Sequence, residues 1–489
     1  MNRLDSQTLS SLPSDVATPV YNRKKIDAGI VHLGIGAFHR AHQAWYTHKA
    51  LNKFGGHWGI VGCSLRSPTV KNQLQPQDGL YCVVERGAEG EKYEVVGSVK
   101  SVLVGPEDPG AVITILAQEN IKIVSLTITE KGYCHDPSTG DLNLSHPDIQ
   151  HDLAHLDHPK SAPGYLLAAL AMRRLKGLPA FTLLSCDNLP DNGHVLRKVI
   201  LQMAEKVDAE LATWIKREAT FPCSMVDRIV PATKEEDREA LQAKLGVIDE
   251  GAVVAEPFSQ WVIEDNFCNG RPHWEEVGVM IVGDVRAYEA MKLRLLNGSH
   301  SLLAYCGYLA GYEHISDTMT NPKLVELVTR FMDDEVTPTL KVPTGFDVEF
   351  YKKQLRERFA NPGLKHRTWQ VAMDGSQKLP QRQVATIRDR LAAGGGVRLC
   401  CLGLAAWMRY VKGVDESGND IDVQDPFSGQ LKAVWQESDG DVVRVVSSIL
   451  AIEEIFGADL MNEEKVVDGI TFWLEAIVSQ GIVEVLNQL

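Results

Sequence analysis

The sequence of 489 residues contains no uninterrupted apolar run of about 18 residues, the shortest length that spans a bilayer as a helix. It has no Cys-x-x-Cys pair, and its nine cysteines are scattered singly apart from Cys400 and Cys401. Such a set is typical of reduced thiols rather than of a disulfide framework. Residues 1–15 lack the apolar core of a signal peptide. Together these absences predict a cytoplasmic protein with no membrane segment.

Basic runs with interleaved aromatic residues are also absent, and the chain carries 64 acidic against 50 basic side chains. An acidic surplus disfavours broad contact with nucleic-acid phosphates. His151 and His155 have the i, i+4 spacing of a metal pair, between His146 and His158, but no neighbouring cysteine or HExxH context accompanies them. We therefore expect no nucleic-acid partner and no metal, with these histidines in a solvated loop.

The length exceeds what one hydrophobic core normally organises, so two domains are expected. The first half alternates β-branched runs with helical stretches, which indicates a mostly parallel sheet. The expected strands are 29–33, 58–65, 93–96, 121–128 and 180–185, and the clearest helices are 163–176 and 194–216. Later apolar spacing is helical, at 321–334, 399–410 and 441–455. The predicted fold is α/β over residues 1–283, after a polar lead-in at 1–28, and mostly α-helical over 284–489.

A glycine turn follows the first expected strand, where residues 29–40 run GIVHLGIGAFHR. Gly34 and Gly36 permit a tight turn close to a ligand, and a helix expected over 41–53 could hold a pyrophosphate at its N-terminus. His39 replaces the third glycine of a GxGxxG pattern, so the helix cannot approach the strand as usual. Arg40 offers a positive charge beside the expected phosphate site. A structural glycine turn explains the same residues equally well.

Residues 291–300, MKLRLLNGSH, place a lysine, an amide and an imidazole in an otherwise apolar helical stretch. At about 100° per residue, Lys292, Asn297 and His300 fall within an arc of roughly 140°. Burial lowers the pKa of a lysine, which can then act as a general base. Asn297 is suited to hold an oxygen at a reacting carbon, and His300 to orient a hydroxyl. Taken singly, each is better explained structurally, as a snorkelling lysine, an Asn-Gly turn or a core histidine, and the trio gains weight from the nucleotide-binding pattern upstream.

Six ordered segments give the chain a family resemblance. They are GIGAFHRAHQAWYT, SLTITEKGY, SCDNLPDNGH, FPCSMVDRIVP, EPFSQWVIEDNF and MKLRLLNGSH, within similar blocks from about residue 29 to about 412. These segments resemble the polyol-specific long-chain dehydrogenases/reductases, a family that contains mannitol 2-dehydrogenases and the fructuronate and tagaturonate reductases. The resemblance implies a Rossmann-type nucleotide-binding domain followed by a largely helical C-terminal domain.

The resemblance also implies the catalytic residues. Lys292 falls on the family's catalytic lysine and His300 on its substrate-orienting histidine. Asn188 and Asn297 fall on the two amides that flank the reacting oxygen. Glu130 matches a glutamate that gates a proton path to the lysine. We expect Lys292 to exchange the proton of the reacting oxygen while the cofactor exchanges the hydride, so that catalysis needs no metal.

Three of these positions have ordinary structural alternatives. Asn188 follows an expected strand, where it can point into a ligand crevice, but it also suits an Asx turn before Pro190. Glu130 is equally a solvated loop carboxylate. Asp227 matches an active-site aspartate of the family and is assigned to substrate binding, yet it could be a structural partner of Arg228.

The expected cofactor site combines the glycine turn with the end of the second strand. Its residues are Ile30, Val31, Leu33, Gly34, Ile35, Gly36, Ala37, Phe38, His39, Arg40 and Arg66. An acidic residue at the end of the second strand normally binds the ribose of NAD, but this strand ends CSLRSPT without a carboxylate. Arg66 could meet a 2′-phosphate or stack on adenine. We expect NAD from the family's habit, with NADP as the alternative.

Residues 366–378, HRTWQVAMDGSQK, resemble the fructuronate reductase branch. Lys378 matches a substrate-binding lysine of the family, whereas Gln370 stands where mannitol dehydrogenases have an arginine. His366, Arg367 and Lys378 are expected to form a cationic cluster that receives a sugar-acid carboxylate. A helix with surface charges is the alternative.

The main hypothesis is a nicotinamide-dependent oxidoreductase that interconverts a keto-sugar acid and an aldonate, of the fructuronate/mannonate type. One alternative is a mannitol 2-dehydrogenase or other polyol dehydrogenase. Another, from a different class, is a catalytically silent nucleotide-binding sensor, which would have no need of a proton-transfer lysine. The expected partner is a small sugar acid or polyol, and the chain is a monomer or small homo-oligomer.

Overall fold

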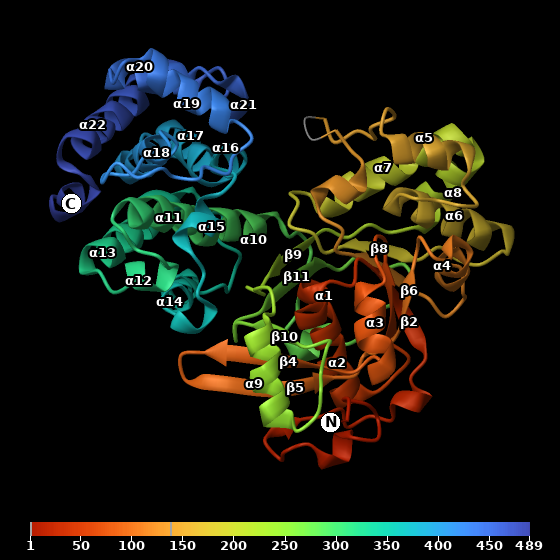
Figure 1. Cartoon of the computed structure of the whole chain (residues 1–489). Coiled ribbons are helices and arrows are strands. Elements are labelled where there is room, and N and C mark those ends of the chain that lie inside the picture. The colour runs from red at the N-terminus through yellow and green to blue at the C-terminus, as the bar shows by residue number, and fades with distance from the viewer. Residues whose placement is uncertain (1, 137–138) are drawn as a thin grey trace. The chain divides into compact units, whose positions relative to one another are not determined.

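The computed structural model describes residues 2–136 and 139–489 of the chain (Figure 1). The chain forms two compact units, Met1–Arg286 and Ala287–Leu489. The first unit is built around a parallel sheet and the second consists of helices. The predicted fold class, a Rossmann-type α/β domain followed by a mostly α-helical domain, is therefore confirmed.

The central sheet of the first unit has five parallel strands in the order β6-β3-β2-β7-β8. The strands are β2 (Ala28–Leu33), β3 (Gly59–Ser64), β6 (Val99–Val104), β7 (Ile123–Leu126) and β8 (Thr182–Ser185). Successive strands extend from β2 first to one side and then, from β7, to the other. This reversal opens a crevice at the carboxyl ends of β2 and β7, where open α/β sheets bind ligands.

The two faces of this sheet are covered by different elements (Figure 1). Val31 and Leu33 of β2 share a core with helices on one face. Those helices are α4 (Pro109–Leu116), α6 (Ala162–Leu175), α7 (Asn192–Val207) and α8 (Ala209–Glu218). Ile30 packs on the opposite face, in a core that includes Trp45 of α2 (Gln43–Phe54). Burial of both faces explains why the inner strands β2, β3 and β7 are mostly apolar rather than alternating, whereas the edge strand β6 carries Lys100 and Ser101.

Two smaller sheets complete the first unit. One has the order β1-β5-β4-β10 and the other β12-β11-β9. Their strands are β1 (Val16–Ala17), β4 (Tyr81–Gly87), β5 (Gly90–Val96), β9 (Ser224–Asp227), β10 (Val253–Ala255), β11 (Gln260–Glu264) and β12 (Met280–Val282). The expected strand at 93–96 thus belongs to a separate sheet, in which β5 pairs antiparallel with β4. β1 pairs with β5, so the polar lead-in is anchored to this unit.

Several expected helices have different boundaries. The helix expected over 41–53 starts earlier, as the five-residue α1 (Ala37–Ala41), and is interrupted at His42 before α2 begins. The helix expected over 194–216 divides into α7 and α8, because the carboxylate of Asp208 accepts the N–H groups that open α8. Residues 147–154, expected in a solvated loop, form α5 (Pro147–Ala154). The remaining helices of this unit are α3 (Thr69–Leu74) and α9 (Glu235–Leu245).

The second unit is organised around α18 (Arg398–Tyr410), whose residues from Leu399 to Tyr410 are all buried, as the dense apolar run predicts. α18 packs against α11 (Ser299–Leu309) and α22 (Glu464–Gln480). The other helices are α10 (Arg286–Met291, which opens the unit), α12 (Ile315–Thr318), α13 (Pro322–Arg330), α14 (Val348–Phe359), α15 (Thr368–Ala372), α16 (Gly375–Leu379), α17 (Ala385–Ala392), α19 (Ser428–Glu437), α20 (Val442–Leu450), α21 (Glu453–Phe456) and α23 (Ile482–Asn487). Three π-helical turns interrupt them, at Lys292–Gly298, Phe331–Val336 and Pro380–Val384.

Within the described residues, 2–136 and 139–489, no helix combines the length and the apolar character needed to cross a membrane.

Candidate functional site

The glycine turn after β2 has the backbone geometry that the sequence predicts. Gly34 has φ +92°, and a Cβ at this position would collide with the backbone carbonyl of Thr127. The N–H of Gly36 donates a hydrogen bond of 2.7 Å to the Gly34 carbonyl oxygen, which closes the turn. A Cβ on Gly36 would meet nothing nearer than 3.9 Å, so its missing side chain leaves open space above the turn. The turn therefore allows a ligand to approach the backbone.

A cavity of about 490 Å³ opens at the carboxyl ends of β2, β3 and β7. The glycine turn (Gly34–Gly36), the loop after β3 and the loop after β7 line it. Arg66, Lys131 and Lys160 add exposed cations to the lining. A crevice of this composition suits an anionic dinucleotide. The lining includes Gly34, Ile35, Gly36 and Arg66 of the expected cofactor residues, whereas Ile30, Val31 and Leu33 are buried in β2 beneath the turn.

The residues that follow the turn, Ala37 to Arg40, pack against or within the protein core. Ala37 and Phe38 open α1. The His39 ring stacks on the His32 ring of β2, with 3.4 Å between centroids, so it fills the space that a third glycine would leave for closer helix packing. Arg40 does not place its charge on the cavity lining as expected: its guanidinium donates to the backbone carbonyl of Gly251 and is buried.

His32 supports the turn from below. Its Nδ1 is 2.8 Å from Ser125 Oγ and its Nε2 is 2.8 Å from Thr127 Oγ1. Thr127 Oγ1 in turn donates a hydrogen bond of 2.8 Å to the Gly34 carbonyl. Burial lowers the pKa of His32 to about 3, so the imidazole stays neutral at physiological pH.

The segments that carry Glu130 and Asn188 are joined by Asp187. The Asp187 carboxylate accepts hydrogen bonds from the N–H groups of Ile128 (3.0 Å) and Thr129 (2.8 Å). It also accepts one of 2.7 Å from the Tyr133 hydroxyl. Burial raises the pKa of Asp187, and these donors oppose that rise. Asp187 thus fixes the start of the loop that holds the exposed Glu130 beside the strand end that leads to Asn188.

Asp227 is buried at the end of β9, opposite Gln260 of β11. The neighbouring Arg228 has partners of its own. Its guanidinium lies 2.6 Å from the carboxylate of Glu85 and stacks over the Trp45 ring at 4.5 Å.

In the second unit, Lys292 and Asn297 lie in a π-helical turn rather than in an α-helix. Hydrogen bonds from i to i+5 make a wider turn, so residues five positions apart come nearer to one face than in an α-helix, which separates them by about 140°. Lys292 is buried at 7% exposure, and His300 follows in α11. The turn therefore gathers the lysine and the amide more closely than the sequence spacing predicts. Such π-turns occur frequently at functional sites.

Arg382 connects this turn to a second one. Arg382 belongs to the π-turn Pro380–Val384, which packs against the π-turn Lys292–Gly298. Its guanidinium donates hydrogen bonds of 3.2 Å to the backbone carbonyl of Asn297 and of 2.8 Å to Ser301 Oγ. Burial lowers the pKa of Arg382 to about 10, which leaves it charged at neutral pH.

Basic side chains act on the imidazole of His300. Its pKa is lowered well below the usual value, first by burial and then by His366, Arg382, Arg358 and Lys378. The His366 ring lies edge-on to His300 at 5.2 Å between centroids. Burial and Arg382 also lower the pKa of Lys378 to about 8, and its ammonium donates to the backbone carbonyl of Met373. A desolvated group of this charge is suited to receive a carboxylate.

Arg367, the third expected member of the cluster, is placed differently. Its side chain is 58% exposed and its Nε lies 3.6 Å from a carboxylate oxygen of Glu313. The expectation that Arg367 joins His366 and Lys378 is therefore wrong, since an exposed arginine already paired with a carboxylate adds little charge to a buried group. Gln370 is exposed, and its side-chain amide oxygen accepts a hydrogen bond of 3.4 Å from the backbone N–H of Arg367.

Sequence reasoning missed Asp187, Arg358 and Arg382. Asp187 stands beside Asn188 and could have been noticed as a polar residue at a strand end. Arg382 follows Lys378 at i+4, a spacing that places both on one helix face. Arg358 precedes the buried Phe359 at the end of α14 and carries no such signal.

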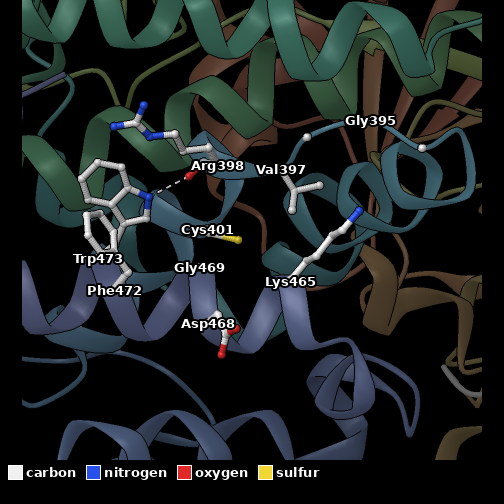
Figure 2. Close-up of a pocket in the computed structure, with 11 residues that line it drawn as sticks. Gly395, Val397, Arg398, Cys401, Lys465, Asp468, Gly469, Phe472 and Trp473 are labelled. Atoms are coloured by element: carbon white, nitrogen blue, oxygen red, sulfur yellow. Dashed lines mark hydrogen bonds between the residues drawn. The ribbon is translucent and has the colours of Figure 1, made fainter.

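The second unit has another cavity, of about 540 Å³, between the α17–α18 loop and α22. Figure 2 shows Arg398, Lys465 and Trp473 around it, with the Trp473 indole N–H donating to the Arg398 carbonyl at 3.0 Å. Its lining contains none of the expected site residues, so it is separate from the group around His300.

Comparisons with known proteins agree with this architecture. Family models of the mannitol dehydrogenase Rossmann domain and C-terminal domain match residues 28–276 and 284–478. The chain is 47% identical to the D-mannonate oxidoreductase of Escherichia coli (strain K12), over 98% of this chain and 99% of that protein. It is 49% identical to the uncharacterized oxidoreductase YeiQ of the same organism, over 98% of each.

A solved structure also resembles the whole chain. The Pseudomonas fluorescens mannitol 2-dehydrogenase, in a ternary complex with NAD and D-mannitol, superposes with a TM-score of 0.87 at 41% identity and 99% coverage of both chains. Full-length identity at this level, with both family models matched in order, extends the resemblance beyond the fold. The chain therefore belongs to the mannitol dehydrogenase family of oxidoreductases, which act on alcohol groups.

Proposed function

We propose that the protein is a nicotinamide-dependent oxidoreductase that interconverts a keto-sugar acid and an aldonate, of the fructuronate/mannonate type. The observation that carries the proposal is a group of basic side chains at His300, where the His366 ring lies 5.2 Å away and Arg382 donates to Ser301, the next residue of α11. Arg358 and Lys378 also act electrostatically on this imidazole. A neutral polyol offers no counter-charge to such a group, whereas a hexuronate carboxylate does. The 47% identity to D-mannonate oxidoreductase supports the same substrate class.

The proposed chemistry divides between the cofactor and the chain. A bound nicotinamide cofactor would supply or remove the hydride. In the reducing direction, Lys292 as an ammonium donates a proton to the oxygen of the former ketone, and in the oxidising direction the neutral amine takes it back. Asn188 and Asn297 hold that oxygen through their amide N–H groups. His300, kept neutral by its surroundings, orients a neighbouring hydroxyl.

Glu130 and Asp227 complete the proposed set. We infer that Glu130, exposed on the loop fixed by Asp187, exchanges protons between Lys292 and solvent. Asp227, buried at the end of β9, is suited to accept a substrate hydroxyl.

The glycine turn and the cavity beside it fit a dinucleotide, because a Cβ is absent where a pyrophosphate would approach and cations line the rim. We propose NAD, which the Pseudomonas fluorescens relative binds in its ternary complex. NADP is the second candidate, because Arg66 rather than a carboxylate lines the cavity after β3. Tryptophan-fluorescence titration with NADH and NADPH, in wild type and Arg66→Ala, distinguishes them: selective loss of NADPH affinity in the variant would favour NADP.

The substrate proposal is tested by comparing fructuronate with fructose at fixed pH and ionic strength. A charge-assisted contact contributes about 1.5–3 kcal/mol, so kcat/KM should favour the keto-acid by about ten- to hundredfold. Lys378→Ala should reduce this preference. Arg367→Ala is the matched control, since its exposed side chain is paired with Glu313 and its loss should leave the preference unchanged.

Two outcomes would replace the proposal. Equal efficiency, or a preference for fructose, would indicate a mannitol-type polyol dehydrogenase. Clear cofactor binding with no turnover of any hexuronate, ketose, polyol or aldonate would indicate a sensor. We further propose a small-molecule partner alone, without nucleic acid, a cytoplasmic location, and a monomer or small homo-oligomer, which light scattering after gel filtration would measure.

A further inference from the structure

Three side chains with metal-binding atoms meet in the first unit, at the start of α7 and the start of β9. Asp191 is the residue before α7, His194 lies in its first turn, and Cys223 immediately precedes β9. One ligand atom from each lies within 4.8 Å of the others. Asp191 and His194 are 55% and 65% exposed, while Cys223 is buried. The group thus has a buried thiol at its base and a face open to solvent.

The separations within this group are close to those of a tetrahedral zinc site. Cys223 Sγ lies 3.8 Å from His194 Nδ1, and His194 Nδ1 lies 3.6 Å from Asp191 Oδ1. Tetrahedral angles with Zn–S of about 2.3 Å, Zn–N of about 2.05 Å and Zn–O of about 2.0 Å give about 3.6 Å for S···N and about 3.3 Å for N···O. The observed separations exceed the ideal values by only about 0.2 Å and about 0.3 Å, so rotation of the exposed side chains is sufficient to close the site.

The backbone that carries these ligands is held independently of any metal. The Asn192 side chain accepts the Ser224 N–H at 3.0 Å and donates to the Ser224 carbonyl at 2.8 Å. It also donates to the Asp187 carbonyl at 3.0 Å. Because Asn192 adjoins Asp191 and Ser224 adjoins Cys223, this clamp fixes the spacing of the ligands. Preorganisation of this kind lowers the cost of binding an ion.

The surrounding charge favours a cation. The carboxylate of Glu264 accepts the Cys223 N–H at 2.9 Å, and Asp284 interacts electrostatically with His194. Arg286 is the opposing charge, and it forms an ion pair of 2.5 Å with Asp284. With Asp191 included, three carboxylates therefore face one guanidinium.

We propose that Asp191, His194 and Cys223 form a binding site for a borderline-soft divalent cation, with Zn²⁺ as the best match. A thiolate and an imidazole select zinc over magnesium or calcium, which prefer oxygen ligands. Binding forms Zn–S, Zn–N and Zn–O bonds and releases the thiol proton of Cys223 to solvent. Water completes the fourth position on the exposed side. None of the three ligands is among the residues proposed for catalysis, which needs no metal.

Cobalt(II) and zinc(II) titrations of the purified full-length protein, freed of metal by chelation, test the proposal. We expect one equivalent of cobalt to give a thiolate-to-cobalt charge-transfer band with tetrahedral visible bands, both displaced by zinc. Cys223→Ser should abolish the charge-transfer band. His194→Gln, at an exposed position that leaves the fold intact, should weaken zinc binding at least about tenfold. Cys268→Ser, a half-buried thiol 3.4 Å from Thr182, is the matched control and should behave as wild type.

Competition against a chromophoric chelator gives the zinc affinities of the same four proteins. The proposal fails if wild type shows no thiolate band with cobalt. It also fails if His194→Gln binds zinc as tightly as wild type, because the metal would then occupy other histidines of the chain.

Discussion

The guanidinium of Arg382 donates a hydrogen bond of 3.2 Å to the backbone carbonyl of Asn297, and a second one of 2.8 Å to Ser301 Oγ. These contacts tie the π-turn that carries Lys292 to a second π-turn. A π-turn is a local departure from the α-helical hydrogen-bond pattern, so a contact from outside the helix can help to hold it. The position of the Asn297 amide therefore depends on an arginine from a distant part of the sequence.

Replacing Arg382 should consequently disturb catalysis more than folding. Loss of a buried charged donor costs about 1–3 kcal/mol, so Arg382→Ala should lower kcat/KM for a keto-acid by about 5- to 150-fold. Steady-state kinetics measure this, with Arg388→Ala as the control, an arginine of α17 that is 40% exposed and paired with Asp459. If kcat/KM falls equally in the two variants, Arg382 does not position the turn that carries Asn297.

Lys292→Ala should nearly abolish turnover while leaving cofactor affinity unchanged. The buried lysine is the proposed proton donor, and general acid-base groups contribute typically about 10²- to 10⁴-fold. Single-turnover kinetics together with NADH titration separate the two effects. A loss below about tenfold would contradict the assignment.

Asn188→Ala and Asn297→Ala should each reduce kcat by about 10²-fold or more. The reason is that an amide donor aimed at a developing alkoxide stabilises the transition state more than the ground state. Measuring kcat and KM separately decides the matter, because an increase confined to KM would make these amides ordinary binding groups.

Gly34→Ala and Gly36→Ala should have different consequences. At Gly34 a Cβ collides with the Thr127 carbonyl and φ is +92°, so the substitution should lower thermal stability. At Gly36 the Cβ enters open space, so stability should be nearly unchanged while NADH affinity falls because the methyl group meets the pyrophosphate. Thermal melts and cofactor titrations measure both, and unaltered NADH affinity in Gly36→Ala would place the pyrophosphate elsewhere.

Acid should destabilise the protein through buried neutral histidines such as His48. Burial, with Lys49 and Arg23 nearby, lowers its pKa to about 3, although Glu94 lies 3.7 Å away. Because the folded pKa is below the unfolded value, the unfolded state binds the extra proton. Stability from His48 is therefore present above about pH 6.5 and is lost as the pH falls toward 3.

Urea unfolding at pH 7 and pH 5 measures this effect. Between pH 7 and pH 5 the free energy of unfolding should fall by about 2 kcal/mol more in wild type than in His48→Gln. His57→Gln is the control, because the His57 side chain is 71% exposed. In this variant the free energy of unfolding should fall between pH 7 and pH 5 by as much as in wild type. If the loss in His48→Gln equals that in wild type, His48 does not titrate as described.

The sequence by itself determined the fold class and the glycine turn. The mostly apolar, β-branched runs at 29–33 and 121–128 form adjacent parallel strands because burial on both faces favours apolar side chains along the strand. Gly34 is equally determined, since its positive φ and its contact with Thr127 exclude any side chain. The glycine turn is a local feature, and the fold class follows from the alternation of strand-like and helical segments along the chain.

Only the tertiary structure decided which charged groups surround His300. His366 and Lys378 were expected together from the sequence, but the addition of Arg358, which comes from α14, and of Arg382 depends on how the helices pack. Arg367 adjoins His366 in the sequence but lies at the surface with Glu313, because neighbouring residues on a helix start point in different directions. The π-turn at Lys292–Gly298 was likewise hidden, since an apolar pattern does not distinguish i+4 from i+5 hydrogen bonding over a single turn.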